Sequence, residues 1–126
     1  MSGPQMRLRA VVLGAPDPQA LAGFYEGLLG WVRDDDHPGW VTLPDPAGGA
    51  GLSFQRESGH VPPVWPPQDG EQQMMAHLDV QVDDLQSASE HAIALGARLS
   101  EHQPQDDVLV HLDPAGHPFC LFLPGA

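Results

Sequence analysis

Side chains that can bind a ligand or move a proton are concentrated in strand-like stretches in the second half of the chain. In the first of these, His77, Asp79 and Gln81 alternate with apolar residues, so the three share one face of a predicted strand. His111 and Cys120 lie in later stretches of a similar kind. An imidazole oriented by a carboxylate is a general base, and imidazole and thiolate are transition-metal ligands. His77 and Asp79 are therefore the candidate catalytic residues, and His77, His111 and Cys120 are the candidate metal ligands.

The closing hairpin decides whether these residues meet. The segment Asp-Pro-Ala-Gly at 113–116 has the composition of a tight turn, which would pair Leu112 with His117. That register places His111 and Cys120 on one face of the sheet, opposite the apolar face that must cover a helix. We therefore expect five polar residues to converge on one concave, ligand-binding surface: His77, Asp79, Gln81, His111 and Cys120.

Other interpretations of these residues stay open. One face of an antiparallel sheet is often solvated, and a histidine there needs no function. Cys120 lies between Phe119 and Leu121, which is typical of a small buried hydrophobic residue. The ligand spacings HxH, HxxxH and CxxC are absent, so local sequence gives only weak support for a metal.

Further contacts to a ligand are expected from aromatic residues, because rings supply large contact areas. The candidate walls are Trp40, Phe54 and Trp65, and Gln55 is a further polar candidate.

An internal duplication shows which elements must position these residues. Three features recur in the same order at offsets of 67, 66 and 68 residues, which predicts two copies of one module. They are a strand-like segment ending in Asp (10–17 and 77–84), a Leu-Gly pair (29–30 and 95–96) and the tetrapeptide Asp-Pro-Ala-Gly (45–48 and 113–116).

Each copy is expected to form a βαβββ module. Asp17 before Pro18 predicts the start of the first helix and Gly30 its end, while Asp83 with Gln86 resembles a capping box for the second. The strands that follow the helices are expected at 31–33, 40–43 and 52–56, and at 97–99, 108–112 and 119–123. The prediction is one α+β domain over residues 1–126, with modules at about 7–56 and 73–123, a Pro-rich linker at about 57–72, and a cup-shaped mixed sheet with helices on its convex side.

Charge restricts the partners. Five Arg, no Lys and 17 acidic residues give a net charge of −12, which argues against nucleic acid and against an anionic membrane surface. Residues 64–126 carry −9 of this charge, from ten acids and one Arg. The acidity fits a solubilising surface, and it leaves a cationic small molecule as an option.

The remaining composition is that of an ordinary folded domain. A single cysteine, no signal peptide and no apolar run of membrane-spanning length predict a cytoplasmic protein.

Several segments resemble the glyoxalase/bleomycin-resistance/extradiol-dioxygenase group, the vicinal oxygen chelate superfamily, and within it a branch of glyoxalase-like domains. The similar region spans residues 7–123. The segments that carry the resemblance are DPQALAGFYEGLLGW (17–31), WVTL (40–43), PVWP (63–66), HLDV (77–80), LGAR (95–98) and DPAGHPFCL (113–121).

The resemblance also implies where a divalent metal would sit, since metal-dependent members place ligands on the first and last strands of each module. Those positions fall on His77, Cys120, Ala10 and either Ser53 or Gln55. Alanine offers no donor, and a cysteine stands where the family has glutamate, so the usual site is incomplete.

The resemblance therefore favours a homodimeric protein that binds a small organic ligand and has a degraded metal site. The alternatives are a metal-dependent or His-based lyase or isomerase, and an interaction module.

Overall fold

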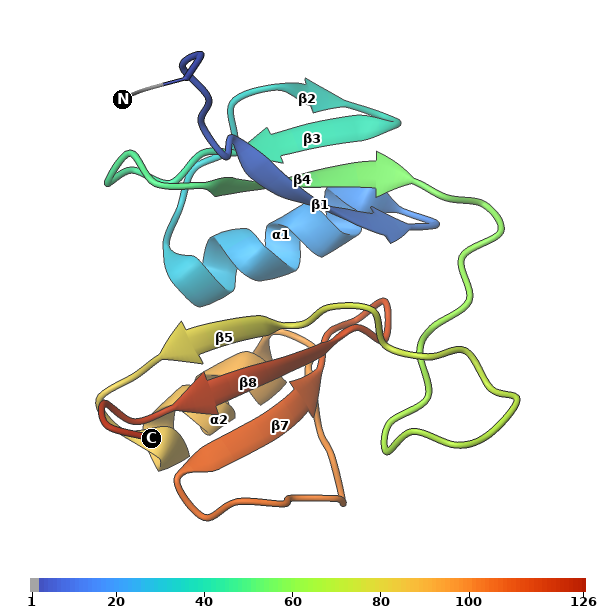
Figure 1. Cartoon of the computed structure of the whole chain (residues 1–126), viewed down its shortest axis with the longest axis vertical. Helices are drawn as coiled ribbons and strands as arrows, with labels where there is room; N and C mark the ends of the chain where they lie inside the picture. The colour runs from blue at the N-terminus through green and yellow to red at the C-terminus, as the bar shows by residue number, and fades with distance from the viewer. Residues whose placement is uncertain (1–2) are drawn as a thin grey trace. The chain divides into compact units, whose positions relative to one another are not determined.

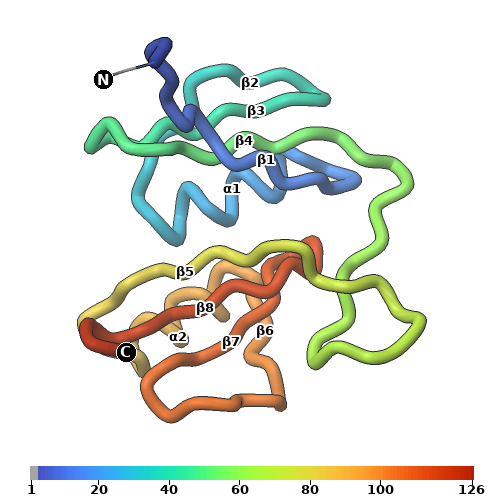
Figure 2. Tube along the Cα trace, in the orientation of Figure 1, coloured from blue at the N-terminus to red at the C-terminus, as the bar shows by residue number. Residues whose placement is uncertain are grey.

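The computed structural model describes residues 3–126 as two compact units, which we call unit 1 (up to Ser58) and unit 2 (Gly59–Ala126) (Figures 1 and 2). Met1 and Ser2, which the predicted domain includes, lie outside the described residues. Each unit holds one helix and one four-stranded sheet, in the order strand, helix and three strands. The α+β class and the two βαβββ modules are confirmed.

Unit 1 contains β1 (Ala10–Ala15), α1 (Pro18–Leu29), β2 (Asp36–His37), β3 (Trp40–Leu43) and β4 (Gly51–Arg56). The sheet order is β1-β4-β3-β2, with β1 parallel to β4 and the other pairs antiparallel.

The strand expected at 31–33 does not form. Arg33 instead forms ion pairs with Glu26 at 2.6 Å and with Asp36 at 3.2 Å. These contacts tie the connection to the end of α1, and the short strand begins three residues later.

Unit 2 repeats the arrangement with β5 (Leu78–Gln81), α2 (Leu85–Ala94), β6 (Arg98–Leu99), β7 (Val108–Leu112) and β8 (Pro118–Phe122). The sheet order is β5-β8-β7-β6, with β5 parallel to β8. None of the described helices is long and apolar enough to span a membrane.

The ends of the helices follow local rules. The Asp17 carboxylate accepts the Ala20 N–H at 3.1 Å, and Gly30 ends α1 with φ of 73°, a left-handed conformation that glycine adopts without strain. The cap of α2 is Asp84, not the predicted Asp83, because it is Asp84 that accepts the Ser87 N–H at 3.0 Å.

The core of unit 1 lies between α1 and one face of its sheet. Phe54 is 0% exposed, and its ring stacks on Tyr25 of the helix with 5.7 Å between centroids. Phe54 therefore lies on the helix side of the sheet, and the expectation that it forms a ligand wall on the open side is corrected.

The β7–β8 hairpin has a different register from the predicted one. Leu112 pairs with Pro118 rather than with His117, because the Asp113 carboxylate accepts the N–H groups of Ala115 and His117 at 2.9 and 3.0 Å. Gly116 has φ of 91°, as expected for the left-handed residue that closes a three-residue hairpin loop.

That one-residue difference moves His111 to the other face, since neighbouring positions of a strand alternate. His111 is 0% exposed, stacks on Phe119 and bonds Ser89 of α2 at 2.8 Å. The expectation that His111 shares a surface with Cys120 is therefore wrong.

Candidate functional site

We call the side of each sheet turned away from its helix the open face. In unit 2 the pairing of β5 with β8 places Asp79 directly beside Cys120. His77, two residues before Asp79, lies on the same face. Three of the five residues predicted to converge are therefore neighbours, and they form what we call the His77 cluster.

The His77 cluster is joined by hydrogen bonds. His77 Nε2 lies 3.0 Å from Asp79 Oδ1, and because a carboxylate only accepts at neutral pH, Nε2 carries the proton and Nδ1 has the free lone pair. The Cys120 thiol also bonds to Asp79. One donor atom from each of the three residues lies within 4.8 Å of the others, close enough to share one ion.

Burial raises the pKa of the Cys120 thiol to about 11, and the negative charge of Asp79 acts in the same direction. Cys120 is therefore a thiol at neutral pH unless a cation displaces its proton.

Alkylation of Cys120 should report this environment directly, because it is the single cysteine of the chain. With its pKa near 11, iodoacetamide should label it at pH 8 about a hundredfold more slowly than an unperturbed thiol. Asp79→Asn removes the second cause of the shift and should speed labelling, while the exposed Asp83→Asn should not. A wild-type rate equal to that of free cysteine would contradict the assigned environment.

A pocket of about 170 Å³ lies beside the His77 cluster, and His77 and Cys120 form part of its wall. The rest of the wall is mainly apolar: Trp65, Met74, Pro104, Gln105, Val108, Val110 and Pro118. Trp65 Nε1 is the one side-chain nitrogen or oxygen that is buried without a hydrogen-bond partner in residues 3–126. We call this cavity the unit 2 pocket.

Two expected members of the site lie outside the unit 2 pocket. Gln81 is exposed at the far end of β5, where it pairs with Phe122. His111 faces α2, as described above.

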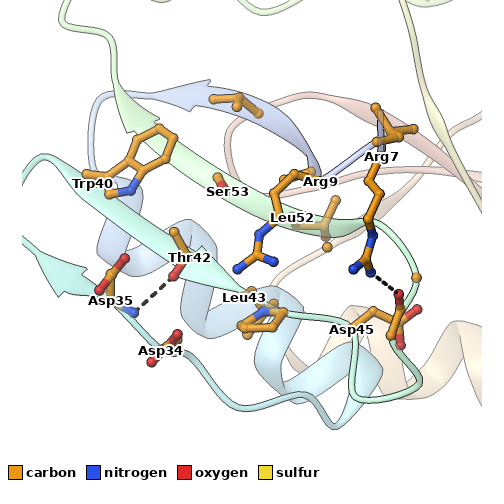
Figure 3. Close-up of a pocket in the computed structure, with 17 residues that line it drawn as sticks. Arg7, Arg9, Asp34, Asp35, Trp40, Thr42, Leu43, Asp45, Leu52 and Ser53 are labelled. Carbon is orange, nitrogen blue, oxygen red and sulfur yellow. Dashed lines mark hydrogen bonds between the residues drawn. The ribbon is translucent and has the colours of Figure 1, made fainter. Parts of the chain in front are cut away.

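A second cavity, of about 540 Å³, lies on the open face of unit 1, and we call it the unit 1 pocket. Figure 3 shows Trp40, Thr42 and Ser53 on its strands. Trp40 was expected to contact a ligand, and it does line this cavity. Gln55 pairs with Trp40 in the sheet, but its amide bonds the Glu57 carboxylate at 2.6 Å and it does not line the cavity.

Several lining residues were not predicted from the sequence. Arg7 and Arg9 precede the first strand, and Asp34 and Asp35 belong to the connection after α1. Met74 and Gln105 belong to long loops of unit 2. Strand periodicity cannot place loop residues. The pair Arg7 and Arg9 was nevertheless a usable signal of a charged site, because the chain has only five Arg.

Comparisons with known proteins agree with this architecture. Residues 10–122 match the family described as glyoxalase-like domain. A glyoxalase/bleomycin resistance protein/dioxygenase family enzyme from Burkholderia phytofirmans PsJN has 19% identity, with 94% of this chain and 98% of that one covered and a TM-score of 0.71. No curated protein matches the sequence.

Two further solved structures are similar in fold. A glyoxalase-related enzyme from Fulvimarina pelagi has 18% identity and a TM-score of 0.66 over 94% of this chain and 88% of that one. A possible glyoxalase from Bacillus cereus has 12% identity and a TM-score of 0.67 over 94% and 99%. At these identities the likeness shows the fold alone.

Paired βαβββ modules of this kind define the vicinal oxygen chelate superfamily. Within it, because the match spans nearly the whole chain, the protein belongs to the family of glyoxalase-like domains. Proteins of this family bind small molecules, and many hold a divalent metal ion.

The residues present fit a metal in one unit only. In unit 2 the His77 cluster offers nitrogen, oxygen and sulfur donors, a set that suits zinc and similar ions. In unit 1 the positions implied by the resemblance carry Ala10, Ser53 and Gln55, none of which is a charged donor.

Proposed function

We propose that the protein binds a small organic molecule and that the unit 2 pocket receives an uncharged part of it. The observation that supports this most strongly is the combination of an apolar cavity with a few polar groups at its edge, the usual composition of a ligand site. His77 Nδ1 and the unpaired Trp65 Nε1–H are the polar groups available to a ligand.

The size of the unit 2 pocket limits the ligand. Pockets for drug-sized molecules measure about 300–1,000 Å³. A cavity of about 170 Å³ suits a single ring or a short chain. The walls formed by Trp65, Met74 and Val110 favour an apolar ring.

Charge also guides the choice of ligand. Among the described residues that line this pocket none is acidic, and the nearby Asp79 carboxylate is already bonded to His77 and Cys120. The lining therefore provides no free carboxylate for a cation, so we favour a neutral group that carries a hydrogen-bond acceptor for Trp65 Nε1–H and a donor for His77 Nδ1.

Two-dimensional ¹⁵N NMR with benzamide and toluene tests this proposal, since only benzamide carries an amide, whose C=O can accept from Trp65 Nε1–H and whose N–H can donate to His77 Nδ1. The chain has three Trp, so three indole N–H signals report separately, and Trp65→Phe assigns the relevant one. Benzamide should shift the Trp65 signal, and toluene should shift it less. His77→Ala should weaken benzamide binding, while His37→Ala, an exposed histidine of unit 1, should not. An unaffected Trp65 signal at millimolar benzamide would contradict the proposal.

A metal-dependent enzyme of the glyoxalase-like type is the second candidate, and the close approach of the three donors in the His77 cluster favours it. A divalent ion bound there would act as a Lewis acid toward oxygen atoms of a substrate. His77 and Asp79 would hold the ion, and the thiol of Cys120 would have to lose its proton to join them.

Elemental analysis of untagged protein and Co²⁺ absorption spectroscopy separate the two candidates. A stoichiometric metal, lost in His77→Ala, with a sulfur-to-cobalt band lost in Cys120→Ser, would support the enzyme. Wild-type protein that takes up neither zinc nor cobalt would leave ligand binding as the better account.

A further inference from the structure

The unit 1 pocket combines charges of both signs around an aromatic side chain. Its lining includes Arg7 and Arg9, two of the five Arg in a chain of net charge −12. Asp34 and Asp35 line the same cavity, and so does Trp40. In Figure 3 the Arg9 guanidinium lies in the middle of the view, with the two aspartates to one side and Trp40 above them.

Arg9 is anchored at its backbone and free at its side chain. Its carbonyl oxygen accepts the N–H of Gly51, the first residue of β4, at 3.0 Å. Its guanidinium makes no hydrogen bond or ion pair within residues 3–126. Arg7 differs, because its Nη2 donates to the Gly48 carbonyl at 3.4 Å. Arg9 is therefore the cation of this cavity that is available to an anionic group.

The two aspartates are held in the same way. The Asp34 N–H donates to the Thr42 carbonyl at 2.9 Å, and the Asp35 N–H donates to the Thr42 hydroxyl at 2.9 Å. Both bonds fix the connection against β3. Neither carboxylate receives a hydrogen bond in the described part of the chain, so both can accept from a ligand.

Ser53 adds an uncharged polar group to the wall of this cavity. It is 4% exposed, it lines the cavity from β4, and its hydroxyl has no hydrogen-bond partner among the described residues. The oxygen is therefore available to a hydrogen-bonding group of a ligand in the cavity.

We propose that the unit 1 pocket binds a zwitterionic organic molecule with a planar apolar body. Arg9 binds its carboxylate, Asp34 and Asp35 bind its ammonium group, and Trp40 contacts the ring. A guanidinium suits a carboxylate because its parallel N–H groups match the two oxygens. The unit 1 and unit 2 pockets share no lining residue, and the proposal does not depend on the function proposed for unit 2.

Three probes with the same para-substituted ring test the charge requirement: 4-(aminomethyl)benzoate, 4-methylbenzoate and 4-methylbenzylammonium. Binding is followed by titration of the Trp40 indole N–H signal, assigned with Trp40→Phe. The zwitterion should bind about fivefold more tightly than either singly charged probe, the upper end of the gain expected from one further exposed ion pair.

Variants of the charged side chains identify which of them binds the carboxylate of the probe and which binds its ammonium group. Arg9→Gln should remove the advantage of the zwitterion over the cation, and the Asp34→Asn/Asp35→Asn double variant should remove its advantage over the anion. Arg98→Gln, at an exposed arginine of unit 2 that lines neither pocket, should change nothing. The proposal is overturned if the three probes bind equally, if none shifts the Trp40 signal, or if Arg9→Gln leaves the preference intact.

Discussion

Replacing Phe54 by alanine is expected to lower the free energy of unfolding by about 3–5 kcal/mol, measured by urea denaturation with far-UV circular dichroism. The side chain is 0% exposed and stacks on Tyr25, so its removal leaves a cavity between the sheet and α1. The loss is a large share of the stability of a typical domain. Phe54→Leu, with a smaller loss, keeps the experiment measurable if the alanine variant does not fold.

Trp40→Ala is the matched control, because Trp40 is a half-exposed aromatic residue of the neighbouring strand that lines the unit 1 pocket. It should cost about 1 kcal/mol or less. Equal losses for the two variants would contradict the assignment of Phe54 to the core and Trp40 to the open face.

Stability is expected to fall as the pH is lowered from 7 to 5, because His111 is buried in its neutral form. Its Nδ1 lies 3.3 Å from the Leu109 carbonyl, which can only accept, so Nε2 accepts from the Ser89 hydroxyl. Burial lowers the pKa of His111 below its ordinary value of 6.5, an effect only partly opposed by the bond to Leu109. Below pH 6.5 the unfolded chain therefore binds a proton that the folded chain does not.

The slope from this one group can reach about 1.4 kcal/mol per pH unit between pH 6.5 and the lower pKa of the folded state. Arg33 lowers the pKa of Glu26, so the stability that this ion pair contributes is lost only at pH values below about 4.5. That loss lies outside the pH range in which His111 is tested. Urea denaturation at pH 7.5, 6.5 and 5.5 measures the slope.

The double variant His111→Phe/Ser89→Ala removes the titrating imidazole and also the Ser89 hydroxyl, which would otherwise lose its partner. In this variant the free energy of unfolding should no longer depend on pH between 7.5 and 5.5. The exposed His37→Gln should keep the wild-type slope. A wild type that is equally stable at pH 7.5 and 5.5, or a double variant with an unchanged slope, would show that His111 does not cause the dependence.

The sequence predicted the elements because their signals are local. Asp17, Pro18 and Gly30 act within one turn of α1, and the structure has each where it was expected. The cap of α2 was displaced by one residue because two aspartates, Asp83 and Asp84, stand side by side and only the hydrogen bond to Ser87 distinguishes them.

The site was harder to predict because it depends on register. Pairing Leu112 with His117 or with Pro118 differs by one residue, and that difference decides whether His111 faces solvent or α2. Gly116 gave the signal that was missed, since a glycine in the left-handed conformation closes a three-residue loop. His77, Asp79 and Cys120 came together as predicted because their positions depend on strand alternation and on the parallel pairing of β5 with β8.

The positions of the charged residues of the unit 1 pocket could not be predicted from the periodicity of strands and helices. Asp34 and Asp35 are placed by hydrogen bonds to Thr42 across the connection that follows α1. Arg9 is placed by its carbonyl bond to Gly51. Such contacts between distant segments have no signature in a single sequence.

The central claim, that the unit 2 pocket receives a small uncharged organic group, is tested most directly by a crystal structure of the protein soaked with benzamide. We expect the ring to lie against Trp65 and Val110, with the amide within hydrogen-bond distance of His77 Nδ1 or Trp65 Nε1. An unfilled pocket in a crystal where these side chains are accessible, or benzamide bound only elsewhere, would contradict the account.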